Sequence, residues 1–262
     1  MQLSQVMFPK YRRGNQLSVN VNYGELTPKE FRTRLDDAPI AYLPLGTLEW
    51  HGEHLPLGSD GIQSTGFFSE LAHKVGGVVL PMLFLGPDSS QSNFGDEFYG
   101  MDINSFPDQE PQQLSGSAYW VSDDLFKHIL EATLKQLSRA GFRIVVAHGH
   151  GPSTSLFQNH ISDWEAMYGL ELFVCWRQDE SDGLGIMTDH AAANETSLVM
   201  ALRPELVYME NLSSDSDDWP LGIMGDDPRV KASAENGSMA IDIQSERMRE
   251  LLNAALERSR GS

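Results

Sequence analysis

Carboxylate and imidazole side chains are concentrated in one short part of the chain, residues 49–60. Glu49 and His51 lie two positions apart, and Asp60 follows a turn rich in glycine and proline. If extended backbone continues beyond the apolar run 40–45, Glu49 and His51 point to one face, because side chains on a strand alternate with a period of two. Asp60, which begins a helix, can then return to the same point. Mixed imidazole and carboxylate donors suit Zn, Mn, Fe or Ni, so this stretch predicts a metal site.

A second interpretation of the same stretch is a polar loop at the mouth of a sheet. In that arrangement Glu53 and His54 are simply solvated, and short Glu-x-His pairs are common enough to occur without a metal. The spatial position of other ligands decides between the two interpretations.

Two other places could supply such ligands. The apolar run 142–147 leads into His150, and the ligand sites of open α/β sheets lie just beyond the carboxyl ends of their strands. His190 and Glu195 lie five positions apart, so they do not share one face of a helix. They can still meet a common centre if His190 lies in the turn before the helix.

The elements that position these residues follow from the hydrophobic pattern. Apolar runs typical of buried strands alternate with amphipathic helical stretches, which predicts crossover units, a mainly parallel sheet and an α/β fold. The expected strands are 40–45, 78–83, 142–147 and 172–176.

Several of the expected helices have recognisable ends. Residues 27–30 form a capping-box pattern that starts a helix to about residue 36, and Ser122 can cap a helix that Gly141 ends. A further helix is expected through residues 157–168, where His160 has a structural role. A C-terminal amphipathic helix is expected over 241–256.

Two segments depart from this alternation. Residues 1–24 show no period and are expected to form a surface arm that packs on the domain or on a neighbouring subunit. Residues 87–118 carry six acidic residues and no basic one. Long structureless segments in compact domains tend to be functional lids or mobile loops, so we expect an acidic inserted loop there. The chain shows no repeat and no low-complexity linker, and residues 1–262 are therefore expected to form a single domain.

The composition limits the partners and the compartment. The excess of 37 acidic over 19 basic residues gives a net charge of −18, which repels nucleic-acid phosphates. No apolar stretch of ~20 residues could span a membrane, and the N-terminus lacks a signal-peptide pattern. The single cysteine, Cys175, excludes an internal disulfide and a thiolate metal cluster. We therefore expect a cytoplasmic protein.

Residues 45–60, L-G-T-L-E-W-H-G-E-H-L-P-L-G-S-D, resemble the signature of the creatininase (creatinine amidohydrolase) family, which is approximately G-S-x-E-x-H-G-x-H-L-P-L-x-T-D. The similarity continues at residues 149–151, 190–197 and 225–237, in the family's order. It covers roughly residues 40–240, most of the chain.

The resemblance implies a three-layer α/β/α domain with its site at the carboxyl ends of the strands. It also implies one or two divalent ions, Zn, Mn or Fe, with Asp60 as the bridge if two are present. A metal lowers the pKa of bound water and polarises a carbonyl, and two ions can share an attacking hydroxide. The implied ligands are Glu49, His51, Asp60, His150 and Glu195.

The implied reaction is hydrolysis of a carbon–nitrogen bond in a small linear amide, a cyclic amide or a formamide. His190, which is expected to titrate near the working pH, is suited to relay the proton to the leaving nitrogen. The resemblance further implies a homo-oligomer, often a hexamer in this family.

The sequence departs from the family after the third strand. The family reads N-G-H-G-G-N where this chain has H-G-H-G-P-S at residues 148–153. Creatininase proper has a metal-binding glutamate two residues after the histidine, where this chain has Pro152. We therefore expect creatinine itself to be a poor substrate.

Two alternatives belong to other functional classes. One is a catalytically weakened, metal-binding regulatory or scaffold member of the same family, which the altered turn after His150 favours. The other is a binding module of this fold without metal, which leaves five metal-capable residues at strand ends unexplained. Metal analysis separates the second alternative from the rest, and a panel of amides separates the first.

Overall fold

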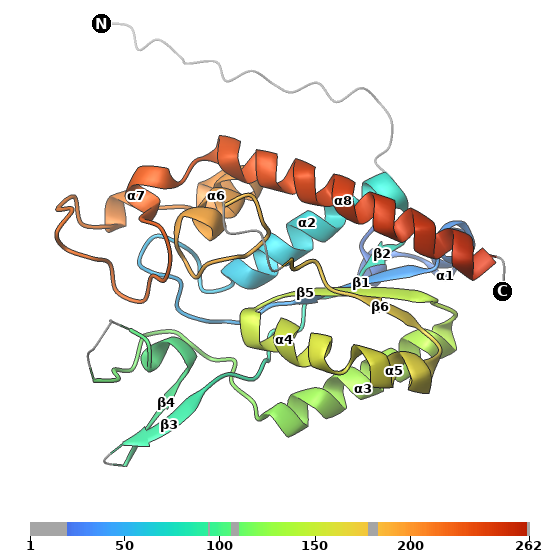
Figure 1. The fold of residues 1–262 in the computed structure, drawn as a ribbon, viewed down its shortest axis with the longest axis horizontal. Helices are drawn as coiled ribbons and strands as arrows, with labels where there is room; N and C mark the ends of the chain where they lie inside the picture. The colour runs from blue at the N-terminus through green and yellow to red at the C-terminus, as the bar shows by residue number, and fades with distance from the viewer. Residues whose placement is uncertain (1–19, 94, 106–109, 178–182, 261–262) are drawn as a thin grey trace, which may run out of the picture.

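A parallel four-stranded sheet forms the centre of the molecule. The computed structural model describes residues 20–93, 95–105, 110–177 and 183–260, and the strand order within them is β2-β1-β5-β6 (Figure 1). The strands are β1 (Ile40–Leu45), β2 (Val78–Val79), β5 (Ile144–Gly149) and β6 (Glu171–Phe173). The register pairs Leu45 with Gly149. The segments that follow β1 and β5 therefore leave the sheet side by side at the same edge.

Helices cover both faces of this sheet, which confirms the predicted three-layer α/β/α architecture (Figure 1). Ile40 and Tyr42 of β1 pack into one helix layer, and Ala41 and Leu43 pack into the other, because alternate side chains of a strand point to opposite faces. The first layer contains α2 (Ser59–Val75), α6 (Ala193–Leu202) and α8 (Ala234–Arg260). The second contains α1 (Pro28–Asp37), α3 (Asp123–Ala140), α4 (Gly151–Asn159) and α5 (Ile161–Tyr168).

Shorter helices complete the described elements. The short helix α7 (Pro228–Lys231) lies against α6, and its first turn is capped by Asp227. Four single-turn 3₁₀ helices occur in the connections: η1 (Tyr23–Glu25), η2 (Gly100–Asp102), η3 (Pro204–Leu206) and η4 (Met209–Asn211).

The predicted helix ends at 27–30, 122 and 141 are confirmed. Thr27 and Glu30 make both bonds of the capping box, and the Ser122 hydroxyl accepts a hydrogen bond from the backbone of Leu125. Gly141 ends α3 in the left-handed conformation, with φ of 100°. Local side-chain chemistry was therefore enough to place these boundaries.

The expected continuous helix over 157–168 is wrong, because the chain breaks at His160 between α4 and α5. The His160 Nδ1–H donates to the carbonyl of Leu156 at 2.9 Å, and the His160 backbone N–H bonds instead to Phe157 at 3.1 Å. The backbone N–H of His160 therefore makes a 3₁₀-type bond at the junction of the two helices. His160 also stacks on Trp164, so its predicted structural role is confirmed.

Other predicted elements have different lengths. The strand expected over 78–83 is regular only in β2, because Pro81 has no backbone N–H, although Leu83 still donates to Pro44 beside β1. The last strand is limited to β6, and the C-terminal helix extends well beyond both ends of the expected range 241–256.

Residues 87–118 are not the structureless loop that the sequence predicted. They contain an antiparallel hairpin of β3 (Ser90–Asn93) and β4 (Asp96–Tyr99), followed by η2, and the hairpin projects away from the sheet (Figure 1). The Tyr99 and Trp120 rings lie 4.7 Å apart, and the Trp120 indole N–H donates to the Asp88 carbonyl at 3.0 Å. These contacts hold the base of the hairpin near the strand ends. Most of the predicted N-terminal arm, residues 1–19, lies outside the described residues.

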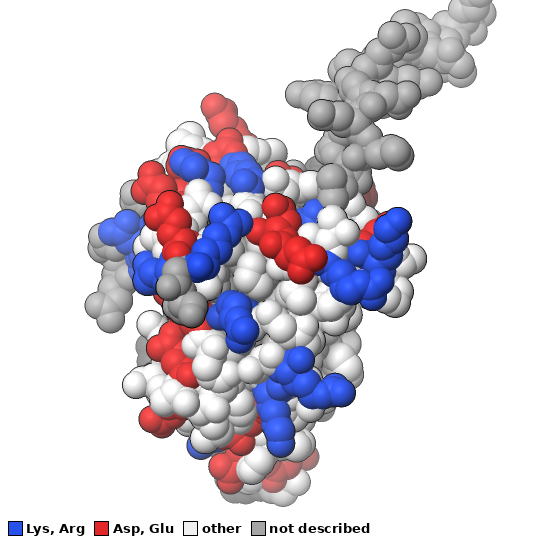
Figure 2. Space-filling view, turned by 90° about the vertical axis from the view of Figure 1, so that its right-hand side faces the viewer, with Lys and Arg blue, Asp and Glu red and all other residues white. Residues whose placement is uncertain are grey.

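Charged side chains of both signs are interspersed at the end of the molecule where α8 finishes. Figure 2 shows Lys and Arg beside Asp and Glu on that face, within a chain of net charge −18. Among the described helices, none combines the length and the apolar character that a membrane span requires.

Candidate metal centre

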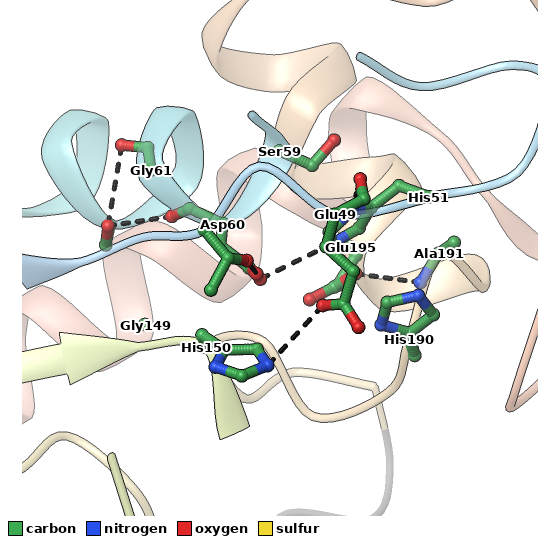
Figure 3. Close-up of polar contacts among 12 residues, drawn as sticks. Glu49, His51, Ser59, Asp60, Gly61, Gly149, His150, His190, Ala191 and Glu195 are labelled. Carbon is green, nitrogen blue, oxygen red and sulfur yellow. Dashed lines mark hydrogen bonds and ion pairs between the residues drawn. The ribbon is translucent and has the colours of Figure 1, made fainter. Parts of the chain in front are cut away.

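The five predicted ligands meet at the edge of the sheet where β1 and β5 end (Figure 3). Glu49 and His51 lie in the loop after β1, and Asp60 lies in the first turn of α2. His150 follows β5 directly, and Glu195 lies in the first turn of α6. Each of the five is at most 4% exposed. The strand-end prediction is therefore confirmed for the placement of these side chains.

Three groups of three residues bring potential ligand atoms together: Glu49, His51 and His190 form one, and the other two share Asp60. Of the two that share Asp60, one is Glu49, Asp60 and His150, the other is His51, Asp60 and Glu195, and the potential ligand atoms in each lie within 4.8 Å of one another. In the first, His150 Nε2 is 3.4 Å from a Glu49 oxygen. In the second, His51 Nε2 is 3.4 Å from Asp60 Oδ1 and 3.6 Å from Glu195 Oε2. Asp60 is thus the residue that these two groups have in common.

Unsatisfied polar atoms indicate that the cluster suits a cation. Glu49 Oε2 and His51 Nε2 are both fully buried and make no hydrogen bond. Buried polar atoms are nearly always hydrogen-bonded, so an orphaned atom points to a bound ion or water or to another functional role. These two atoms belong to the ligand groups and face the other ligands, whereas the other such atoms of the described residues lie on His54, Gln63 and His148.

The ligand side chains are held by contacts behind them. The Thr47 hydroxyl donates to Asp60 at 2.5 Å, and the backbone N–H of Ala191 donates to Glu195 at 2.7 Å. His51 donates from Nδ1 to the Glu49 backbone carbonyl, and His150 Nδ1 lies 3.0 Å from the hydroxyl of Ser153. With Nδ1 engaged in each ring, Nε2 is left for a metal, as is usual for histidine ligands.

A close backbone approach fixes the turn that carries His150. Gly149 has φ of 151°, and a Cβ at this position would lie 1.9 Å from the carbonyl oxygen of Leu45. The His150 backbone N–H donates to that same carbonyl at 2.7 Å. Only glycine allows the two strand ends to come this close, so the G-H-G motif has a direct role in placing the ligand.

The electrostatics of the buried cluster also favour a cation. Burial raises the pKa of Glu49 to about 7, against the opposing effect of His150, and raises that of Glu195 well above its ordinary value, against His51. Burial alone would lower the pKa of His51, but Asp60 and then Glu195 outweigh it and raise the value to about 10. The cluster therefore retains protons that a divalent cation can replace.

His190 lies just before α6, the position that allows it to meet a common centre with Glu195, and it lines a cavity beside the ligands. Its Nε2–H donates to the Trp50 carbonyl at 2.8 Å, and its ring lies 4.5 Å from that of His51. Burial, together with His51, lowers the pKa of His190 to about 3. This environment favours the neutral imidazole.

The interpretation of the 49–60 stretch as a solvated loop fails at His54. Glu53 is exposed, but His54 has no exposed surface, and its Nε2 lies 2.9 Å from the hydroxyl of Thr196 on α6. The second histidine of the motif thus joins the loop to the helix that carries Glu195.

Two residues that contact the ligand cluster, Asp88 and Tyr119, were not identified from the sequence. The Tyr119 hydroxyl lies 2.9 Å from Glu49 Oε1 and 2.8 Å from Asp88 Oδ2, and Asp88 lies 3.2 Å from His150 Nε2. Asp88 follows a segment that runs beside β1 towards the same edge, and that position was the available signal.

Asp88 and four of the predicted ligands border a cavity of about 220 Å³. Glu49, Asp60, His150 and Glu195 line one part of it, and the remainder includes Met101, Asn104, Pro152 and Met187. A cavity of this size accommodates a small molecule beside the ligand cluster.

Comparisons with known proteins agree with this arrangement. A family model described as creatinine amidohydrolase matches residues 24–258. Creatinine amidohydrolase of Pseudomonas putida is 27% identical over 224 residues, 75% of this chain and 77% of that protein. A structure titled as a mutant creatininase of Zn-Zn type has a TM-score of 0.69 at 20% identity, covering 90% of this chain and 98% of its own.

A structure titled "Creatininase Mn" also has a TM-score of 0.69 at 20% identity, and the match covers 90% of this chain and 99% of that one. At this level of identity the structures support the fold, whereas the family model covers nearly the whole sequence. The chain therefore belongs to the creatininase family, a family of hydrolases that act on carbon–nitrogen bonds.

Proposed function

We propose that this protein is a metal-dependent amidohydrolase that cleaves the carbon–nitrogen bond of a small linear or cyclic amide or formamide. The observation that carries the proposal is the pair of ligand groups that share Asp60 at the wall of a 220 Å³ cavity. Two-metal hydrolases use this type of arrangement, in which a single carboxylate serves both ions.

The chain offers a separate ligand set for each ion. Glu49 and His150 would hold one cation, His51 and Glu195 would hold the other, and Asp60 would contact both. The mixture of imidazole and carboxylate donors suits Zn, Mn or Fe. When bound, such cations polarise a carbonyl and bring the pKa of a bound water towards neutrality.

His190 would move the proton during hydrolysis. Its Nε2–H is engaged by the Trp50 carbonyl, so Nδ1 carries the free lone pair of a neutral ring. A neutral imidazole can accept a proton from the attacking water and then deliver it to the leaving nitrogen. The contact to Trp50 fixes the ring orientation that this transfer needs.

Creatinine should be hydrolysed weakly or not at all. Pro152 offers no polar side chain where it lines the cavity, and Asp88 enters from the opposite segment. The substrate would therefore meet a different set of polar groups beside the first ligand set. Loss of one well-placed polar contact can lower a rate by ~10²-fold or more.

A substrate panel with metal-free and metal-loaded protein tests the proposal. Hydrolysis of linear amides, cyclic amides and formamides would be followed with no metal and with Zn²⁺, Mn²⁺ or Fe²⁺. We expect hydrolysis of at least one amide that requires metal, and creatinine turnover well below that rate. Metal binding without hydrolysis of any amide would favour the regulatory or scaffold alternative instead.

A further inference from the structure

Asp88 is a carboxylate in the cavity that neither ligand group includes. It comes from the base of the 87–118 segment, far from the signature motif in the sequence, and its side chain is 12% exposed. Its Oδ2 lies 3.2 Å from His150 Nε2, the nitrogen that is free to bind a metal.

The separations around His150 Nε2 match those of ligands on one ion. Asp88 Oδ2 lies 3.2 Å from this nitrogen, and Glu49 Oε2 lies 3.4 Å from it. Two donor atoms that each lie about 2.1 Å from a cation are roughly 3.0–3.4 Å apart at octahedral or tetrahedral angles. The Asp88 carboxylate therefore lies at nearly the same distance from His150 Nε2 as the carboxylate of Glu49 does.

A shared donor joins the two carboxylates on this side of the centre. The Tyr119 hydroxyl is 2.9 Å from Glu49 Oε1 and 2.8 Å from Asp88 Oδ2. The other Asp88 oxygen accepts the backbone N–H of Ser89 at 2.7 Å. Glu49 Oε2 is left buried with no hydrogen bond, on the side that faces His150.

The charges in this part of the cavity require a counter-ion. Asp88, Glu49, Asp60 and Glu195 all line this cavity, and the Asp88 side chain is only 12% exposed. The described residues that line the cavity include no Lys or Arg. Buried carboxylates in such a setting need a cation or a protonated imidazole beside them.

We propose that Asp88 is a further ligand of the cation held by Glu49, Asp60 and His150. This inference rests on the proposed metal-dependent function and deepens it. It gives this ion three carboxylates and one imidazole, whereas the other ion has two carboxylates and one imidazole. The oxygen-rich set should prefer Mn²⁺ or Fe²⁺ more strongly than the other set does.

Metal titration of the Asp88→Asn variant tests the assignment. Asparagine preserves the size of the side chain and removes its charge. We expect the wild-type chain to bind two Mn²⁺ ions and Asp88→Asn to bind one with little change and the other at least ~10²-fold more weakly, because even indirect partners of metal ligands are worth 10–100-fold. Asp96→Asn, an exposed change in the same hairpin, should bind both ions as the wild type does.

The Tyr119→Phe variant separates coordination from positioning. If Asp88 only anchors Tyr119, then Asp88→Asn and Tyr119→Phe should weaken metal binding equally. If Asp88 coordinates the ion, Tyr119→Phe should cause a much smaller loss. Unchanged affinity for both ions in Asp88→Asn, or equal losses in the two variants, would overturn the assignment. A wild-type chain that binds no metal would instead remove the proposed function.

Cobalt spectroscopy of the Asp88→Cys variant gives a readout that a merely structural role would not produce. A thiolate that binds Co²⁺ adds an intense sulfur-to-metal absorption band. We expect this band in Co²⁺-loaded Asp88→Cys and not in the wild type or in Asp96→Cys. Bound Co²⁺ without the band would show that position 88 lies outside the coordination sphere.

Discussion

Asp60 is the residue on which both ligand groups depend, since it is the member that they share. Asp60→Ala should therefore release both ions, whereas His51→Ala should release the ion on its own side. The fold should survive, because the removed carboxylate contributes little apolar contact. Metal analysis after dialysis and thermal unfolding in a chelator would measure the two effects.

The matched control for Asp60→Ala is Glu53→Gln, which alters an exposed carboxylate of the same motif. It should keep full metal content. If Asp60→Ala or His51→Ala retained every ion, the ligand assignment would be wrong.

His190 should affect catalysis without affecting metal content. Positioned acid–base groups contribute typically 10²–10⁴-fold to a rate, so kcat of His190→Ala should fall within that range. Steady-state kinetics on an amide identified in the panel, with metal analysis of the same samples, would test this. His73→Ala, on the exposed side of α2, should leave kcat unchanged. A similar kcat for both variants would exclude His190 from proton transfer.

At the scale of elements, His54 links the motif loop to α6 and should make folding sensitive to acid. Burial lowers the pKa of His54 to about 4, compared with an ordinary value of 6.5. The unfolded chain therefore takes up its proton first as the pH falls. The stabilisation is complete above pH 6.5 and is lost between pH 6.5 and about 4, by on the order of 3 kcal/mol for this shift.

Urea unfolding of metal-free protein at several pH values would test the role of His54. His54→Gln can keep a hydrogen bond to Thr196 but does not titrate in this range. Its free energy of unfolding should fall less between pH 6.5 and 4 than that of the wild type. Parallel pH curves for the two proteins would rule out His54 as a source of acid sensitivity.

The sequence was sufficient to predict those elements that are determined by local residue patterns. Apolar runs predicted the sheet, and the strand-end rule correctly placed Glu49 and His150 together, because parallel strands bring their carboxyl ends to one edge. The break at His160 was not predicted, because no proline or glycine marks it in the sequence. Asp88 was also missed, since its position depends on contacts of Trp120 and Tyr119 rather than on any period.

At the scale of the whole molecule, the surface carries large apolar side chains that a monomer would leave in water. Val230 is 78% exposed, Met224 is 51% exposed and Phe84 is 46% exposed. Single exposed apolar side chains are also common on monomers, so the expected assembly depends mainly on the resemblance. The family resemblance leads us to expect a homo-oligomer, with a hexamer as the expected form. Sedimentation velocity at working concentration should show a species larger than 29.2 kDa, and a monomer would contradict the expectation.

The central claim is that two cations share Asp60 at the carboxyl edge of the sheet. An anomalous-difference map from crystals grown with Mn²⁺ tests it most directly. The account predicts two peaks in the cavity, about 3.5–4 Å apart, one beside Glu49 and His150 and the other beside His51 and Glu195, with the Asp60 carboxylate between them. A map with no peak at these side chains, or with Mn²⁺ bound elsewhere only, would contradict it.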